Sequence, residues 1–389
     1  MRFAALPPVR RPVPMTRGTG ETRRILERFF AERKITLYAS GTAALGAALS
    51  ACVRRAAIDR PEIIVPAYGC PALIAACMSA GATPRLVDVA ADCWSYDLDA
   101  LRLSITARTV ALVAVNLLGL GDGALDLLEL CHSRSIPLIQ DSAQYLPREP
   151  IAWPGDFIIL SFGRGKPLNL LYGGALIAPR DAVLPTPMSP TPGPVRNRLL
   201  ATRAAGLAFN LLTRPHAYWL LSHLPGTGLG EVSYTSLAAC QCTPLPDRAW
   251  RRLGPAFVQY CRTPSYSRQI WAQAIEEWCS HGIEELCGPK SLPPLEPLRL
   301  ALLAPDRNAR DSIVAHFNRA YLGASRFYGT DLPHIESLPE CVRQQGPFPN
   351  ASRLAARLYT LPTHSLVGPV AIQTARRIMR AWRRSRCAK

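Results

Sequence analysis

The chain has 389 residues, long enough for two or three structural units, and hydrophobic residues make up 48% of it. Charged residues make up only 19%, a balance that excludes a mostly disordered protein. The formal net charge of +17 favours contact with phosphates, acidic ligands or an anionic membrane surface, but it does not choose among them.

The cysteines and the N-terminal residues indicate the compartment. The 12 cysteines are scattered and form no C-x-x-C pair, so no zinc site is predicted. The first residues contain arginines and prolines but no apolar run of the kind that a secretory signal needs. No stretch of about 18 apolar residues is present either. We therefore expect a cytoplasmic protein with reduced thiols.

Seven short apolar runs predict strands, at 35–39, 62–68, 84–89, 109–116, 136–142, 157–162 and 173–179. They are rich in Val, Ile and Leu and do not alternate with polar residues, as is typical of strands buried on both faces. Helix-length segments lie between most of them, at 43–57, 71–80, 97–105 and 124–134. The pattern predicts an α/β fold with a mostly parallel seven-stranded sheet flanked by helices.

The character of the sequence changes after about residue 180. We expect an N-terminal segment at 1–33, a large α/β domain at 34–240 and a smaller C-terminal α+β domain at 241–389. A proline-rich excursion is predicted at 181–197 and a helical insert at 198–224. The last part contains the apolar segment LRLALLAP (298–305), and helices are predicted there at 311–322 and 371–384. The insert mixes basic residues with Leu, Phe, Trp and Tyr, so core packing or a dimer contact is the preferred reading and a membrane-surface helix the alternative.

The turn Ser40-Gly41-Thr42 lies between the first strand and the first helix. A helix that opens on a small, glycine-containing turn presents free backbone N–H groups, and these suit a phosphate. The simpler explanation is an ordinary helix cap.

Asp141 ends the strand IPLIQD, at the sheet edge where ligands bind in open α/β folds. A carboxylate there needs a cation or hydrogen-bond donors, and a protonated ring nitrogen would serve. Gln144 could offer its amide to the same ligand. The alternative is that Asp141 caps its own backbone.

The loop SFGRGK delivers Ser161 and Lys166 after the sixth predicted strand. A lysine near other cations and partly desolvated has a lowered pKa and can attack a carbonyl, so Lys166 is a candidate for an imine bond. Tyr68 ends the second strand, where its ring could cover a flat cofactor or simply pack in the core. Together these features describe a site for pyridoxal phosphate.

The sequence resembles the sugar aminotransferases of the DegT/StrS type, within the fold-type I pyridoxal phosphate enzymes. The matching segments are ASGTAALGAAL (39–49), IIVPAYGCPALIAACMSAGATPRLVDV (63–89), IQDSAQ (139–144), SFGRGKPLNLLYGGALI (161–177) and FPNASRLAARLYTLPTHSLVG (348–368). The resemblance implies that Lys166 bonds the cofactor, Asp141 pairs with its ring nitrogen and Gln144 faces its ring oxygen. It also implies that the phosphate is bound by Gly41, Thr42 and Ser161.

Several positions depart from the family pattern. Cys70 stands where a second aromatic is usual, Tyr172 where an acidic residue precedes the double glycine, and Asn116 where a histidine is expected. The phosphate ligand that the family takes from the partner subunit has no clear match in 228–241, although Glu231, Ser233, Tyr234 or Thr235 could replace it. These changes bear on the substrate more than on the cofactor.

The resemblance implies an aminotransferase that moves an amino group from an amino acid, glutamate by default, to a keto group of a sugar nucleotide. It also implies a homodimer with a shared active site. A non-sugar carbonyl acceptor of a natural-product pathway and a non-catalytic scaffold are the alternatives. Nucleic-acid binding is not expected, because the basic residues are dispersed and no binding motif is present.

Overall fold

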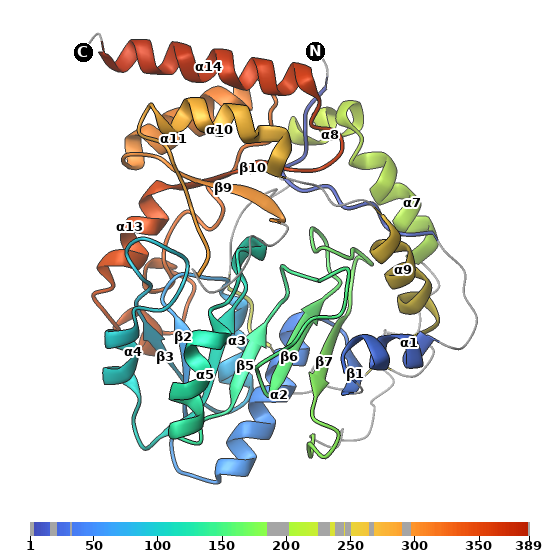
Figure 1. Ribbon diagram of the computed structural model, residues 1–389, viewed down its shortest axis with the longest axis vertical. Helices are drawn as coiled ribbons and strands as arrows, with labels where there is room; N and C mark the ends of the chain where they lie inside the picture. Colours follow the sequence, from blue (N-terminus) through green and yellow to red (C-terminus); the bar gives the residue numbers. More distant parts are fainter. Residues whose placement is uncertain are drawn as a thin grey trace.

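The computed structural model describes residues 4–15, 22–31, 33–184, 202–224, 234–237, 245, 250–263, 268–289 and 297–387. Seven strands form its main sheet, in the order β1-β7-β6-β5-β4-β2-β3 (Figure 1). They are β1 (Lys34–Tyr38), β2 (Glu62–Pro66), β3 (Thr83–Val87), β4 (Thr109–Val115), β5 (Leu138–Asp141), β6 (Phe157–Ser161) and β7 (Gly174–Ala178). Only β7 runs antiparallel to its neighbours, β1 and β6. The predicted α/β class with a mostly parallel sheet is confirmed.

Helices cover both faces of this sheet because its strands are apolar on both sides. In β2, Ile63 and Val65 pack with α2 (Gly41–Ala56) and α3 (Ala72–Ser79). The residue between them, Ile64, packs on the opposite face with Leu101 of α4 (Leu98–Ser104) and Leu127 of α5 (Ala124–Ser133). The alternation of side chains along a strand thus places a helical layer on each face.

A smaller antiparallel sheet follows, in the order β10-β9-β8, with strands β8 (Glu284–Glu285), β9 (Arg299–Leu303) and β10 (Leu358–Pro362). Its helices are α10 (Ala272–Cys279), α11 (Arg307–Arg319), α12 (Glu340–Arg343), α13 (Pro349–Arg357) and α14 (Pro369–Cys387). Trp271, Trp278 and Phe317 fill the core between this sheet and its helices. The smaller α+β unit is therefore present, and α11 and α14 overlap the helices predicted at 311–322 and 371–384.

The predicted domain boundary at 240/241 falls outside the described residues. The next helix, α9 (Trp250–Arg262), packs on the large unit although it follows that boundary. Its Leu253 and Phe257 share a core cluster with residues of the main sheet. The cluster also contains Leu26 of α1 (Thr22–Phe29) and Phe30, which directly follows α1. Contacts distant in sequence, which local patterns do not encode, place α9 there.

The N-terminal segment 4–15 links the two units. The backbone carbonyl of Pro7 accepts a hydrogen bond of 2.8 Å from Nε2 of His364, after β10. The carbonyl of Arg11 accepts one of 2.8 Å from Nδ2 of Asn169, in the loop after β6. The segment therefore spans from the small unit to the loop that carries Lys166.

The predicted insert at 198–224 contains two helices, α7 (Thr202–Leu212) and α8 (Pro215–Ser222). They are separate because proline at the start of α8 cannot donate the hydrogen bond that would continue α7. Most of the predicted excursion at 181–197 lies outside the described residues. No helix of the described chain combines the length and apolar character that crossing a bilayer requires.

Candidate functional site

The predicted site residues come from neighbouring elements of the main sheet. Asp141 ends β5, in register with Val115 of β4 and Ile159 of β6. Ser161 ends β6 and pairs with Gly174 of β7. Because parallel strands present their carboxyl ends at one edge, Asp141 and the loop after Ser161 share that edge.

The start of α2 lies against the end of β6. A Cβ placed on Gly41 would lie 2.7 Å from Cβ of Ser161, and one on Gly174 would lie 2.4 Å from the backbone nitrogen of Gly41. Only glycine allows an approach this close. The helix begins at Ser40, whose Oγ accepts a hydrogen bond of 3.1 Å from the backbone N–H of Ala43. The start of this helix, where backbone N–H groups have no partner within the helix, therefore lies against Ser161, and such a group of donors suits an anion.

Lys166 lies on a tight turn of the loop after β6. Its backbone N–H donates to the carbonyl of Gly163 at 3.3 Å, and Gly165 adopts a φ of +72° that favours glycine. The base of the loop is closed by hydrogen bonds of Phe162 to Gly173 and of Leu170 to Phe162, each 2.8 Å. These contacts hold the lysine at the end of β6, partly buried.

Asp141 and Lys166 interact electrostatically. Burial raises the pKa of Asp141, and the positive charge of Lys166 and the N–H of Ala143, at 3.0 Å, oppose this rise. Nearby Asp122 raises the pKa further. The carboxylate thus lies in a site that favours a second cation.

Gln144 connects the two units of the protein. Its Oε1 accepts a hydrogen bond of 2.9 Å from the N–H of Leu118, and its Nε2 donates one of 2.9 Å to the hydroxyl of Tyr328. One of the two Nε2 hydrogens remains for another acceptor. Both ends of the Gln144 amide are therefore held by hydrogen bonds. Burial raises the pKa of Tyr328, and the negative charge of Asp141 raises it further.

Tyr328 is a site residue that sequence reasoning missed. It follows Phe327, which has a φ of +58°, a strained conformation for a bulky side chain. The N–H of Phe327 donates to Oγ of Ser325 at 3.0 Å and stabilises this turn. No local motif marks the turn, so only the contact with Gln144 reveals it.

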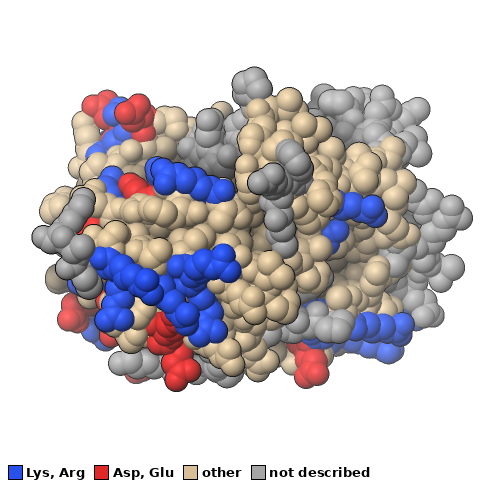
Figure 2. Space-filling view, turned by 90° about the horizontal axis from the view of Figure 1, so that it is seen from above, with Lys and Arg blue, Asp and Glu red and all other residues tan. Residues whose placement is uncertain are grey.

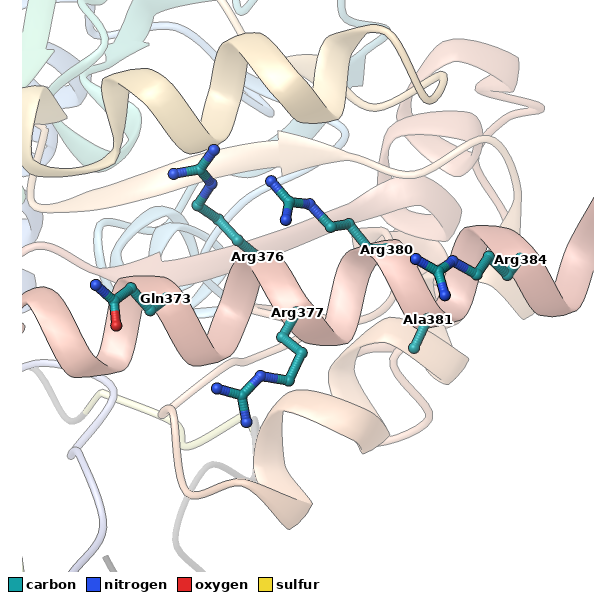
Figure 3. Close-up of a pocket in the computed structure, with 6 residues that line it drawn as sticks. All are labelled: Gln373, Arg376, Arg377, Arg380, Ala381 and Arg384. Carbon is teal, nitrogen blue, oxygen red and sulfur yellow. The ribbon is translucent and has the colours of Figure 1, made fainter.

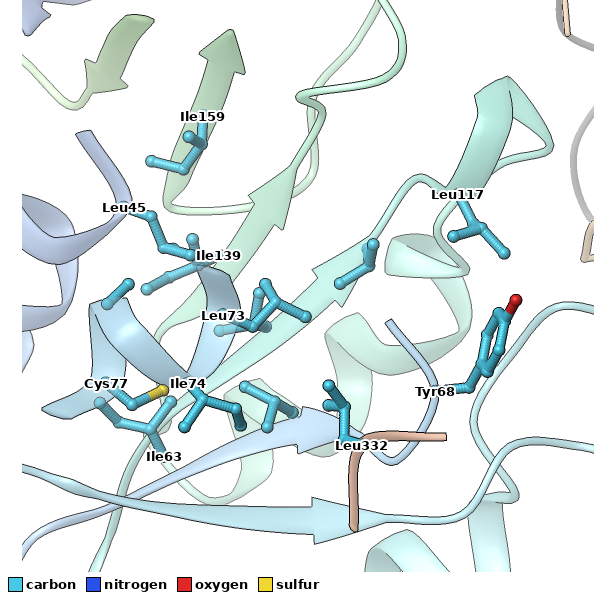
Figure 4. Close-up of a cluster of buried hydrophobic side chains, with 14 of the residues drawn as sticks. Leu45, Ile63, Tyr68, Leu73, Ile74, Cys77, Leu117, Ile139, Ile159 and Leu332 are labelled. Atoms are coloured by element: carbon cyan, nitrogen blue, oxygen red, sulfur yellow. The ribbon is translucent and has the colours of Figure 1, made fainter. Parts of the chain in front are cut away.

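Tyr68 lies deeper than the other predicted residues, with no exposed surface. Its ring packs edge-on against Trp94 and Tyr328, with centroids 6.3 and 5.6 Å apart. Its buried hydroxyl lies near the backbone of Tyr328 without a hydrogen bond of good geometry. Figure 4 shows it in the same apolar cluster as Leu117 and Leu332. Cys70, two residues on, is partly exposed, and stacking by Tyr68 stays a prediction.

The departures from the family pattern have defined positions. Asn116 is buried, and its Oδ1 accepts a hydrogen bond of 3.1 Å from the N–H of Gly121. The guanidinium of Arg252 lies 5.9 Å from the ring centroid of Tyr172. Of the candidate partner-subunit ligands, Glu231 and Ser233 lie outside the described residues. The N–H of Tyr234 donates to Oγ of Ser337 at 3.2 Å, and Thr235 is exposed.

Part of the chain is similar in sequence to known proteins. Residues 18–185 match the DegT/DnrJ/EryC1/StrS aminotransferase family. The chain is 32% identical to a UDP-N-acetyl-3-dehydro-alpha-D-glucosamine 3-aminotransferase of Acidithiobacillus ferrooxidans, over 38% of this chain and 40% of that protein. It is 34% identical to an L-glutamine:2-deoxy-scyllo-inosose aminotransferase of Streptomyces lividus, over 43% of this chain and 40% of that protein. The chain thus matches about two fifths of the length of these relatives.

The fold of the chain is also similar to that of solved structures. A structure described as a sugar aminotransferase of Streptococcus pneumoniae, in its PLP form, superposes with a TM-score of 0.66 at 18% identity, over 95% of this chain and 92% of that one. At this identity the likeness establishes the fold. The resemblance that the sequence predicts is confirmed for residues 18–185.

Proposed function

We propose that this chain, a distant relative of the DegT/DnrJ/EryC1/StrS aminotransferases through residues 18–185, is an aminotransferase that uses pyridoxal 5'-phosphate. It would move an amino group from an amino acid to a keto group of a sugar nucleotide or a related carbonyl compound. One observation carries the proposal: Lys166 and the half-buried Asp141 interact at the edge of the sheet where Gly41 and Ser161 meet.

The residues present fit this cofactor. Gly41 and Ser161 lie close together at the start of α2. A methyl group at residue 41 would occupy the space beside the hydroxyl of Ser161. Burial disfavours the charged form of Asp141, and a ring nitrogen that carries a proton would offset this cost. Donors for an anion and a carboxylate for a cation therefore occur at the same edge of the sheet as the loop that carries Lys166.

In this proposal the phosphate is bound by the backbone of Gly41 and Thr42 and by the hydroxyl of Ser161. The start of α2 adds the favourable end of its dipole. Asp141 holds the ring nitrogen in its protonated form, and Gln144 orients the ring through its free amide hydrogen. Tyr68 remains the proposed aromatic neighbour of the ring, with Tyr328 between it and Gln144.

Pyridoxal phosphate, when bound, supplies an aldehyde that reacts with amines and a ring that withdraws electrons from the Cα of an amino acid. Lys166 first holds the cofactor through its Nζ. Its free amine, released when the amino donor takes its place, would remove the proton from Cα of the donor and hold it at Nζ. The partly buried position of Lys166 limits the access of water during this transfer.

The proposed donor is glutamate, with glutamine as the alternative suggested by the name of the Streptomyces lividus relative. The proposed assembly is a homodimer with a shared active site, in which a residue of 228–241 completes the phosphate site of the partner. The proposed setting is the cytoplasm, where free thiols such as Cys52 and Cys77 stay reduced.

The test is a transamination assay with the purified full chain. Glutamate or glutamine is offered with a panel of keto sugar nucleotides and simple ketones, and aminated products are identified by mass spectrometry. Amination of a keto sugar nucleotide, lost in Lys166→Ala, supports the proposal. A chain that binds pyridoxal phosphate but aminates nothing in the panel would contradict it and favour a scaffold role.

A non-sugar carbonyl acceptor is the second candidate. It is supported by the similarity to the Streptomyces lividus protein, which is named for an inosose, and by the substitutions at Cys70, Tyr172 and Asn116. Preferential amination of a cyclic ketone without a nucleotide would favour this candidate.

A further inference from the structure

The outward faces of α7 and α8 are apolar. Leu207, Leu211 and Leu212 of α7 are 59%, 55% and 43% exposed, and the spacing of four residues places Leu207 and Leu211 on one side of the helix. Leu220 of α8 is 59% exposed, and Leu224, just after it, is 50% exposed. Large apolar side chains gathered at one place on a surface mark a contact site more often than scattered ones do.

The inward faces of the two helices are anchored, so these leucines do not simply belong to a loose segment. The side chain of Asn210 binds both backbone groups of Val13, at 2.7 Å to its N–H and 3.0 Å to its carbonyl. The N–H of Ala5 donates to the carbonyl of Pro215 at 3.0 Å. The ring of His223 lies 5.9 Å from that of Tyr321, in the small unit.

The helices α7, α8 and α14 contain no acidic residue, although Glu277 and Asp306 lie beside α14. No aspartate or glutamate occurs in 182–230, and none occurs in 341–389. The second stretch contains α14, which lies at the same end of the molecule as α8 (Figure 1). Seen from that end, lysine and arginine side chains gather in one dense group beside a wide uncharged area (Figure 2).

The outer side of α14 is rich in arginine. A shallow groove of about 400 Å³ there is lined by Gln373, Arg376, Arg377, Arg380, Ala381 and Arg384 (Figure 3). Arg376 and Arg380 bind Glu277. Within the described chain, Arg377 and Arg384 make no ion pair, so their charges remain for an external anion.

We propose that α7, α8 and α14 form a docking surface for a lipid bilayer with anionic headgroups. The exposed leucines would enter the region between headgroups and acyl chains, and the arginines would contact lipid phosphates. The complementary charge favours a bilayer over a second copy of the chain, since two copies meeting here would bring like-charged helices together. The inference is independent of the proposed transamination.

The test is co-sedimentation of the full chain with vesicles of phosphatidylcholine alone or mixed with phosphatidylglycerol. We expect binding to the mixed vesicles, at least tenfold weaker to phosphatidylcholine alone, and weakened by salt. The double variant Leu211→Gln, Leu220→Gln should bind at least tenfold less well. The matched control Leu103→Gln, at a position 85% exposed on α4, should bind as the natural chain does.

Two further variants keep the test decisive. Arg377→Gln with Arg384→Gln should weaken binding and reduce its dependence on salt, with unchanged binding at high salt concentration. In Leu211→Trp, the fluorescence of the added tryptophan should shift to the blue with mixed vesicles and should be quenched by brominated lipid. This measurement does not depend on whether the double leucine variant folds. Absence of binding to the mixed vesicles overturns the proposal. So does a double variant that binds vesicles normally but sediments as a smaller oligomer, which would assign this face to a contact between copies.

Discussion

Asp141 lies where ionisation is unfavourable in the absence of a ligand. Burial raises its pKa in the folded protein, so folding favours the protonated acid, and the penalty grows as the pH rises above the ordinary value of about 3.9. Lys166 reduces this penalty without removing its cause. Asp141 thus lowers the stability of the protein without ligand and provides a carboxylate that a cationic ligand can contact.

Asp141→Asn should therefore separate stability from binding. An asparagine oxygen can still accept the hydrogen bond from Ala143, so without cofactor the variant should unfold at a higher temperature than the natural chain at pH 7. The difference should shrink as the pH falls towards 4, because the raised pKa of Asp141 favours uptake of a proton in the folded protein. The affinity for pyridoxal phosphate should fall at least tenfold. Thermal unfolding at both pH values and a cofactor titration measure this, and unchanged affinity would contradict the role of Asp141.

Gly41→Ala tests the contact between the helix start and β6. The new methyl group would lie 2.7 Å from Cβ of Ser161, an overlap that typically costs about 1–3 kcal/mol of stability. We expect denaturant unfolding to show this loss, and a weaker affinity for both pyridoxal phosphate and inorganic phosphate. Gly368→Ala is the control, because no atom lies within 4 Å of its added methyl group. Equal phosphate affinity in both variants argues against the proposed anion site.

Tyr328→Phe removes the hydrogen-bond partner of Gln144 and keeps the ring. A hydrogen bond of this kind contributes about 0.5–1.5 kcal/mol, so the cofactor should bind roughly 2- to 10-fold more weakly. Its visible absorbance should also titrate at a different pH. Tyr359→Phe is the control, since that buried hydroxyl has no hydrogen-bond partner within the described chain. A Tyr328→Phe variant that behaves like this control would place Tyr328 outside the site.

At the scale of elements, the N-terminal segment 4–15 depends on a neutral histidine. His364 is buried, and burial, the largest cause, lowers its pKa to about 4. Because the folded value lies below the ordinary value of about 6.5, the stability is complete above pH 6.5 and is lost as the pH falls towards 4. The hydrogen bond from Nε2 to the carbonyl of Pro7 favours the protonated ring, but the cost of burying the positive charge is larger, so the fold as a whole loses stability.

His364→Gln should flatten this pH dependence. The natural chain should lose up to about 1.4 kcal/mol per pH unit at this site between pH 6.5 and 4, and the variant should not. His132→Gln, at an exposed position of α5, should leave the dependence intact. Urea unfolding at several pH values measures both, and an equally steep loss in His364→Gln would show that another group is responsible.

At the scale of the whole molecule, local patterns predict what depends on neighbours in sequence. Runs such as 63–67 and 157–160 are apolar because their strands are covered on both faces, so the sheet and its class could be predicted. Asp141 could be placed at the sheet edge because it directly follows such a run. Lys166 could be placed beside it because a short glycine loop follows the neighbouring strand.

Contacts between distant segments could not be predicted in this way. The bond of Gln144 to Tyr328 joins two units across a turn with a strained phenylalanine, which no propensity indicates. The packing of α9 on the large unit and the bond of His364 to Pro7 arise from tertiary structure alone. The complete burial of Tyr68 likewise depends on Trp94 and Tyr328, two residues distant in sequence whose rings pack against its ring.

The central claim is that the amine of Lys166 bonds pyridoxal phosphate beside Asp141, and one labelling experiment tests it directly. The full chain is loaded with pyridoxal phosphate, treated with borohydride to make the bond permanent, digested, and mapped by mass spectrometry. We expect the cofactor on the peptide that carries Lys166, and much less of it in Asp141→Asn. A label spread over surface lysines, with Lys166 unmodified, would contradict the account.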